Sequence, residues 1–179
     1  MKIILSLIVA SMILGAFVPM VYAQETKPIN LALFDPVQIF KKDVPIKGFR
    51  FNLIYGNNSA MTGLDMGVAN WVTGETKGLQ WGLVVNYTAG NFTGWQAAPL
   101  QKVGGHALGV QMGWLVAING SGKGLQASGV TISDDYIGLQ IGVVNYAVQL
   151  HGIQIGLVNI IKNGGMLPFF PIFNYSFDK

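Results

Sequence analysis

The sequence predicts an all-β protein built from a tandem repeat. A glycine, an apolar residue and a polar residue recur in eight copies, spaced 14 to 16 residues apart. Within each copy, large apolar residues alternate with small or polar ones at a period of two, which is typical of a strand and not of a helix. Glycine is also frequent, at 24 of 179 residues, and polar turn-like stretches separate the copies.

The eight copies share more than their first three residues. A second small residue usually follows four places after the first glycine, and asparagine closes several copies. The copies begin at Gly48-Phe49-Arg50, Gly63-Leu64-Asp65, Gly78-Leu79-Gln80, Gly94-Trp95-Gln96, Gly109-Val110-Gln111, Gly124-Leu125-Gln126, Gly138-Leu139-Gln140 and Gly152-Ile153-Gln154. The residues that define the repeat, and that we expect to be structural, are Gly63, Gly78, Gln80, Gly82, Gln96, Gln111, Gln126, Gly138, Gln140, Gly142, Asn145, Gly152, Gln154, Gly156 and Asn159.

Each copy predicts a strand of about eight residues with two unlike faces. In the seventh copy, one face carries Leu139, Ile141, Val143 and Asn145. The other face carries Gly138, Gln140, Gly142 and Val144. We therefore expect one large apolar face and one small face with a Gly-Gln-Gly pattern.

Two architectures fit such a repeat. Successive strands joined by short turns form an antiparallel meander that closes into a small barrel. Alternatively, each copy is one coil of a parallel β-solenoid, which would stack the glutamines and the asparagines in columns. We favour the meander or barrel, because a coil of 14 to 16 residues with a straight eight-residue strand leaves little chain for the return path.

The end of the chain predicts one further strand. Residues Leu167 to Phe177 alternate with aromatic side chains at nearly every second position, and Asp178-Lys179 follow them. This segment resembles the terminal aromatic strand of bacterial outer-membrane barrels. In such a barrel the Leu-Ile-Val faces would contact lipid and the Gly-Gln faces would point inward. The alternative is a soluble domain that buries the Leu-Ile-Val faces in its core.

The first residues have the pattern of a secretory signal peptide. Lys2 precedes an apolar run, and Val21-Tyr22-Ala23 places small residues three and one before the expected cleavage site. The apolar run is shorter than the roughly 20 residues of a membrane-spanning helix. We thus expect a signal peptide at residues 1–23, an extended lead-in at 24–47 and a β-repeat domain at 48–179.

Composition excludes several classes of function. The chain has no cysteine, and its net charge of +3 is too small and scattered for nucleic-acid binding. His106 and His151 lack the neighbouring carboxylates of a catalytic or metal site. The segment Gly120-Ser121-Gly122-Lys123-Gly124 fails the phosphate-loop pattern, and Asp134-Asp135 is too small a set for calcium. We predict no catalytic, cofactor-binding or metal-binding residue and no enzymatic activity.

The copies GLQWGLVVN, GLQIGVVNY and GIQIGLVNI, with the closing LPFFPIFNYSF, resemble a bacterial family of exported surface-repeat proteins with GLQxGLxN-type repeats. The resemblance covers residues from about Gly48 to Phe177 and lapses at 95–100 and 127–131. It implies an outer-membrane or cell-surface location and a structural or interaction role, with outer-membrane lipid or envelope components as partners. The alternative is a soluble periplasmic or secreted binding module. Neither reading names a specific protein partner.

Overall fold

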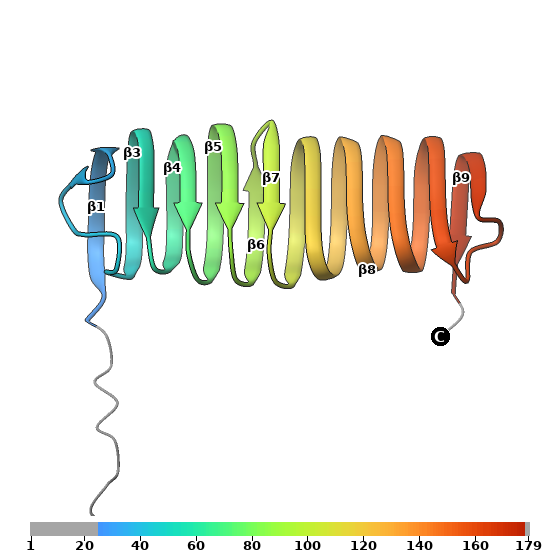
Figure 1. The fold of residues 1–179 in the computed structure, drawn as a ribbon, viewed down its shortest axis with the longest axis horizontal. Helices are drawn as coiled ribbons and strands as arrows, with labels where there is room; N and C mark the ends of the chain where they lie inside the picture. The colour runs from blue at the N-terminus through green and yellow to red at the C-terminus, as the bar shows by residue number, and fades with distance from the viewer. Residues whose placement is uncertain (1–24, 178–179) are drawn as a thin grey trace, which may run out of the picture.

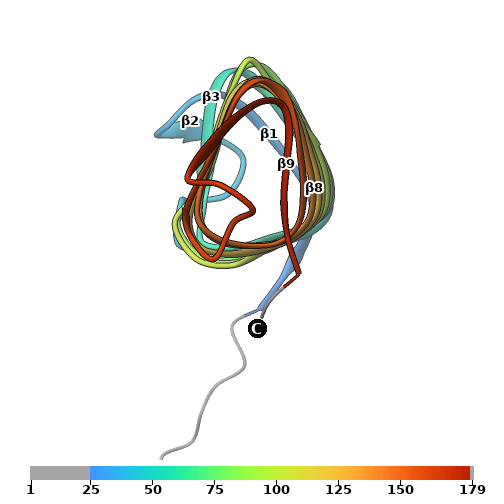
Figure 2. The same cartoon turned by 90° about the vertical axis from the view of Figure 1, so that its right-hand side faces the viewer.

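The protein is a β-solenoid. The computed structural model describes residues 25–177, and the predicted signal peptide lies outside this part of the chain. The described chain is all-β and winds into stacked coils that follow one another in a single row (Figure 1). Along the axis of this row, the coils superpose into a rounded, three-sided outline (Figure 2). The prediction of an all-β repeat array is therefore confirmed.

Strands that are close in the sequence also lie close together along the solenoid, from one end to the other. One of them, β8, is 57 residues long because it continues through several coils without interruption. The strands are β1 (Lys27–Phe34), β2 (Val37–Gln38), β3 (Ile46–Asn58), β4 (Met61–Val72), β5 (Thr76–Thr88), β6 (Phe92–Ala97), β7 (Leu100–Val103), β8 (Ala107–Asn163) and β9 (Phe169–Ser176).

Neighbouring coils pair in parallel, which makes the favoured antiparallel meander or small barrel wrong and the alternative solenoid right. β3 pairs with β4, β4 with β5 and β5 with β6, always in parallel. The glycine that begins each copy lies beside the glycine that begins the next, as in the pair Gly63 and Gly78. Within the described chain, antiparallel pairing occurs only at the two ends, between β1 and β2 and between β8 and β9.

The meander prediction fails because it assumes straight strands, whereas the strands are bent. The pairing register shifts between Asn52 and Tyr55 and between Gly67 and Ala69, so each coil turns a corner in the middle of its predicted strand. One repeat thus supplies two sides of the three-sided coil, and the remaining residues suffice for the third. The corner also resets the alternation of side chains. Asn145 consequently points into the solenoid, whereas simple alternation predicts it on the same face as Leu139.

The first glycine of each copy is required by its backbone. Gly138 has a φ of 131°, and a Cβ built there would lie 2.2 Å from the carbonyl oxygen of Gly124 in the preceding coil. A side chain is therefore opposed both by the dihedral angle and by the close approach of the neighbouring coil. The same combination recurs at all eight copies, from Gly48 to Gly152.

The interior divides into an apolar corner and a polar region. The apolar corner holds two clusters, and the larger one includes Phe92, Tyr136 and Leu150. The smaller cluster comprises Ile46, Met61 and Val72 and is covered by Phe40 and Val44 near the N-terminal end. The polar region holds the glutamines and asparagines of the repeat.

Candidate functional site

All six of the predicted glutamines are buried inside the solenoid, where they form one column. Their side chains are at most 3% exposed, at Gln80, Gln96, Gln111, Gln126, Gln140 and Gln154. The amides of four successive coils form a hydrogen-bonded ladder. Gln154 donates to Gln140 (2.9 Å), Gln140 to Gln126 (2.7 Å) and Gln126 to Gln111 (3.2 Å). These four bonded glutamines therefore stabilise the stack of coils, whereas the buried side-chain amide of Gln96 has no hydrogen-bond partner among the described residues. None of the six forms an outer Gly-Gln surface for a ligand.

The predicted asparagines form a second buried column. Asn145 Nδ2 donates to Asn159 Oδ1 over 2.8 Å, and Asn159 Nδ2 continues to the carbonyl of Phe170 over 3.1 Å. Nearer the N-terminal end, Asn70 donates to Asn86 in the same way over 2.9 Å. A buried amide is stable only when its hydrogen bonds are made, and stacking like residues on successive coils provides the partners.

The predicted second glycines, Gly82, Gly142 and Gly156, leave room for these amides. A Cβ built at Gly82 would lie 2.3 Å from the Asn86 side-chain oxygen. One at Gly156 would lie 2.7 Å from the Asn145 nitrogen and 1.9 Å from the carbonyl oxygen of Gly142. This second glycine position is less strictly conserved among the copies than the first glycine position, because Ala98 and Ser128 occupy it in two coils.

A buried ion pair replaces glutamine in the first two copies. Arg50 and Asp65 are fully buried and form two parallel hydrogen bonds of 2.7 Å each. Gln80 from the next coil also donates to Asp65 (2.9 Å), and Arg50 donates to Asn58 (3.2 Å). Both charges are thus paired and hydrogen-bonded, as a buried ion pair needs to be.

The outside of the solenoid carries a continuous apolar surface, which we call the apolar face. Its two rows of side chains flank the glutamine column, and each row runs through ten successive strand segments. The first row is Ile29, Phe49, Leu64, Leu79, Trp95, Val110, Leu125, Leu139, Ile153 and Tyr175. The second is Leu31, Phe51, Met66, Trp81, Ala97, Met112, Ala127, Ile141, Ile155 and Phe173.

Twelve of these twenty side chains are exposed and the other eight are half-buried, which is unusual for apolar rows of a folded monomer. Leu79 is 51% exposed, and at the adjoining corner Trp114 and Leu157 reach 74% and 69%. With nine steps of about 4.8 Å between strands and five residues of about 3.4 Å across, the face measures about 43 Å by 17 Å. Its area, on the order of 700 Å², exceeds the largest apolar patch of a typical monomer, about 300–600 Å².

A mostly polar edge, interrupted by the exposed Leu108 and Ile137, lies beside the first glycines of the copies, and we call it the loop edge. It is made by the exposed residues directly before those glycines, which are Lys47, Thr62, Lys77, Thr93, Leu108, Lys123, Ile137 and His151. The adjoining turns add Glu75 and His106. Lys77 forms an exposed ion pair of 3.0 Å with Glu75, and this partner holds the pKa of the Glu75 carboxyl below its usual value. The loop edge thus carries charged side chains, whereas the two rows of the apolar face carry none.

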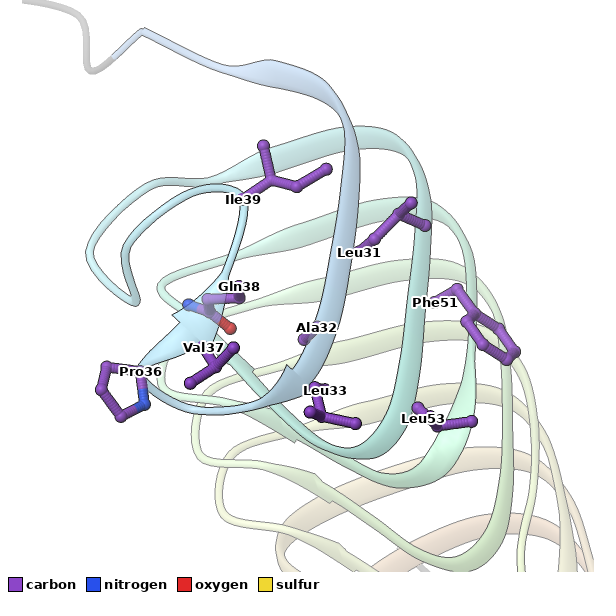
Figure 3. A pocket seen from close by; sticks show the side chains of 9 residues that line it. All are labelled: Leu31, Ala32, Leu33, Pro36, Val37, Gln38, Ile39, Phe51 and Leu53. Atoms are coloured by element: carbon purple, nitrogen blue, oxygen red, sulfur yellow. The ribbon is translucent and has the colours of Figure 1, made fainter.

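A groove of about 530 Å³ opens at the N-terminal end of the apolar face. Figure 3 shows its two walls: Leu31, Leu33, Phe51 and Leu53 on β1 and β3, and Pro36, Val37 and Ile39 on the segment that folds back around β2. Gln38 also lines it; its Nε2 donates to the Asn57 carbonyl (3.0 Å), whereas its buried Oε1 has no hydrogen-bond partner in the described chain.

A second groove, of about 590 Å³, lies toward the C-terminal end of the same face. It is lined by small residues, at 127–129, 142 and 156, and by larger apolar ones that include Ile141, Ile155, Leu157 and Ile172. Both ends of the apolar face are therefore hollowed and lined mainly by apolar side chains.

His106 and His151, the two histidines considered for a catalytic or metal site, both lie on the surface and make separate local contacts. His106 Nδ1 accepts a hydrogen bond from the Ser121 backbone N–H (3.1 Å) and lies 2.7 Å from the Ser121 hydroxyl. This contact joins the turns of two neighbouring coils. His151 packs edge-on against Phe177. Within residues 25–177, no three His, Cys, Asp or Glu side chains gather in a way that could hold a metal ion.

No helix among the described residues is long and apolar enough to cross a membrane. Comparisons with protein-family models, with curated proteins and with solved structures find no match for this chain.

Proposed function

We propose that this chain is an exported protein of the bacterial cell envelope with a structural or interaction role, and that it attaches to its partner through the apolar face. The observation that carries this proposal is that polar and apolar side chains are distributed in the opposite way to an ordinary soluble protein. The amide columns lie inside the solenoid, and two uninterrupted apolar rows lie outside.

This distribution is costly for a protein that works alone in water. Exposed apolar area disfavours the dispersed state by about 25 cal/mol per Å², so a face of some 700 Å² corresponds to roughly 17 kcal/mol. Even a small part of that amount would favour association with an apolar surface. The polar loop edge, by contrast, suits contact with water.

Export is supported by the pattern of the first 23 residues, and an envelope location by the resemblance of the repeats to exported surface-repeat proteins. A role in binding or scaffolding fits the geometry better than catalysis. The Ser121 hydroxyl and the His106 ring lie close together, but the ring nitrogen facing the hydroxyl already accepts a backbone N–H, and no carboxylate among the described contacts orients the ring.

Expression of the full chain in a Gram-negative bacterial host tests the proposal. We expect the mature protein to begin at Gln24, by mass spectrometry, and to stay with the membrane pellet after an alkaline wash. An uncleaved chain in the cytoplasm would overturn export. A mature chain released entirely into the periplasmic or culture fluid would overturn envelope attachment and favour a soluble binding module.

A further inference from the structure

We propose that the partner of the apolar face is the acyl-chain region of a lipid bilayer, on which the solenoid lies side-on with its axis along the membrane. This inference rests on the proposed function and names its partner. Four features of the described chain lead to it: the composition of the face, the pairing of its backbone, its length and its grooves.

The composition of the face matches hydrocarbon better than it matches another protein. Its two rows contain no charged side chain and no amide, and their polar atoms are confined to Trp81, Trp95 and Tyr175. A protein–protein interface of this area would carry several hydrogen bonds, at about one per 100–200 Å². Tryptophan and tyrosine are the polar-tipped residues that are enriched where proteins meet lipid.

The backbone of the face can enter hydrocarbon because it is already paired. Acyl chains offer no hydrogen-bond partner, so backbone N–H and C=O groups that contact them must be satisfied within the protein. In the solenoid, each inner coil pairs with the coil on either side, as β4 does with β3 and β5. The unpaired strand edges are confined to the two ends of the stack.

The length of the face sets its orientation. The apolar rows extend about 43 Å along the solenoid axis, whereas the hydrocarbon core of a bilayer is about 30 Å thick. A solenoid standing upright would also place the lysines of the loop edge in hydrocarbon. Lying side-on, it buries the apolar rows and leaves Lys47, Lys77 and Lys123 in water.

The grooves at the two ends of the face favour a fluid partner. Each is lined mainly by apolar side chains, and each makes the surface of the apolar face concave where the regular rows would otherwise leave it flat. Flexible acyl chains fill such hollows without a matching shape, whereas a second copy of the same face would leave voids opposite them.

Two triple variants with the same net charge test the proposal. The first places lysine on the face (Leu79→Lys, Met112→Lys and Ile141→Lys), and the second places lysine on the loop edge (Thr62→Lys, Thr93→Lys and His151→Lys). All six side chains point outward and are exposed, so both variants should keep the β-sheet circular dichroism of the parent. The probe is flotation with vesicles of phosphatidylcholine, a neutral lipid that does not respond to added charge.

We expect the parent and the loop-edge variant to float with the vesicles, and the face variant to lose at least tenfold in binding. Equal flotation of both variants, or no flotation of the parent, would overturn the proposal. A parent that stays in solution as a defined dimer would also overturn it, since the face would then be covered by a second copy.

Tryptophan fluorescence gives a second readout that does not depend on these variants. Trp81 lies on the apolar face, whereas Trp71 lies beyond the corner of its coil, with its ring centroid 4.0 Å from that of Tyr87 and the two rings tilted by 32°. In variants that retain one tryptophan each, with phenylalanine at the other three, bromine-labelled acyl chains should quench Trp81 strongly and Trp71 weakly. The reverse order would contradict the assigned face.

These outcomes separate the inference from the proposed function. A protein held in the envelope of cells, but unable to bind vesicles, would retain the proposed function and overturn lipid as the partner. A protein that binds vesicles, but is released from cells in soluble form, would overturn envelope attachment.

Discussion

Gly138 shows how one residue type governs the spacing of the whole stack. Its positive φ and the 2.2 Å approach to the Gly124 carbonyl leave no room for a side chain. The same requirement at each copy explains why the first position of the repeat is always glycine, whereas the second small position also holds Ala98 and Ser128.

Gly138→Ala should therefore lower the free energy of unfolding by about 3 kcal/mol, the upper range for one strained backbone conformation. Gly142→Ala is the matched control, because a Cβ there would also lie close to a backbone carbonyl oxygen, 2.5 Å from that of Ser128, but Gly142 does not have a positive φ. We expect a smaller loss there. Urea unfolding followed by circular dichroism measures both variants, and equal losses would contradict the special role of the first glycine.

Tyr136, in the apolar corner, should make the stability of the fold depend on pH. Its side chain is 1% exposed and packs over Gly122, and burial raises the pKa of its phenol above the ordinary value of about 10. A pKa that is higher in the folded state stabilises the protein fully below pH 10. The contribution is lost as pH rises from 10 toward the folded-state pKa.

Between pH 10 and 12, the parent should lose up to about 1.4 kcal/mol of stability per pH unit from this group. Tyr136→Phe lacks the ionisable phenol and should lose correspondingly less over the same range. Urea midpoints of both proteins at pH 8 and at pH 11 measure the difference. Equal losses of stability in the two proteins would contradict this prediction, because they would show that ionisation of Tyr136 does not destabilise the fold.

At the scale of the coil, the buried pair of Arg50 and Asp65 is equivalent to two glutamines of the inner column. Asp65→Asn would leave the Arg50 guanidinium buried without its counter-charge, and we expect a loss of about 3–5 kcal/mol. The double variant Arg50→Gln with Asp65→Gln restores the residue used by the next coils and should recover most of that loss. Thermal unfolding of the three proteins measures this; a double variant as unstable as Asp65→Asn would contradict the equivalence.

The coil also shows which parts of the fold could be predicted from the sequence. The repeat length, the strand period and the glycine and glutamine columns follow directly from the spacing of residues. The corner near residue 144 does not, because a bend between two apolar residues leaves no trace in an alternating pattern. Missing that corner placed Asn145 on the wrong face and made the coil seem too short to close.

At the scale of the whole molecule, an alternating pattern shows that two faces differ, but it does not show which one lies inside. Leu79 and Gln80 are neighbours in the sequence, and either could occupy the core of a β protein. Burial of a glutamine such as Gln140 becomes favourable because the glutamines of the neighbouring coils stack on it and bond to it, and that stacking exists only in the parallel solenoid. The apolar outer face could therefore not be assigned before the topology.

The central claim is that the polar column lies inside and the apolar rows lie outside. Since the chain has no native cysteine, thiol labelling of Leu79→Cys and Gln80→Cys in the folded, detergent-solubilised protein tests it most directly. We predict that N-ethylmaleimide reacts rapidly at position 79, and at position 80 only after unfolding in urea. Rapid reaction at position 80 with protection at position 79 would contradict the account, because it would place the leucine row in the core and the glutamine column on the surface.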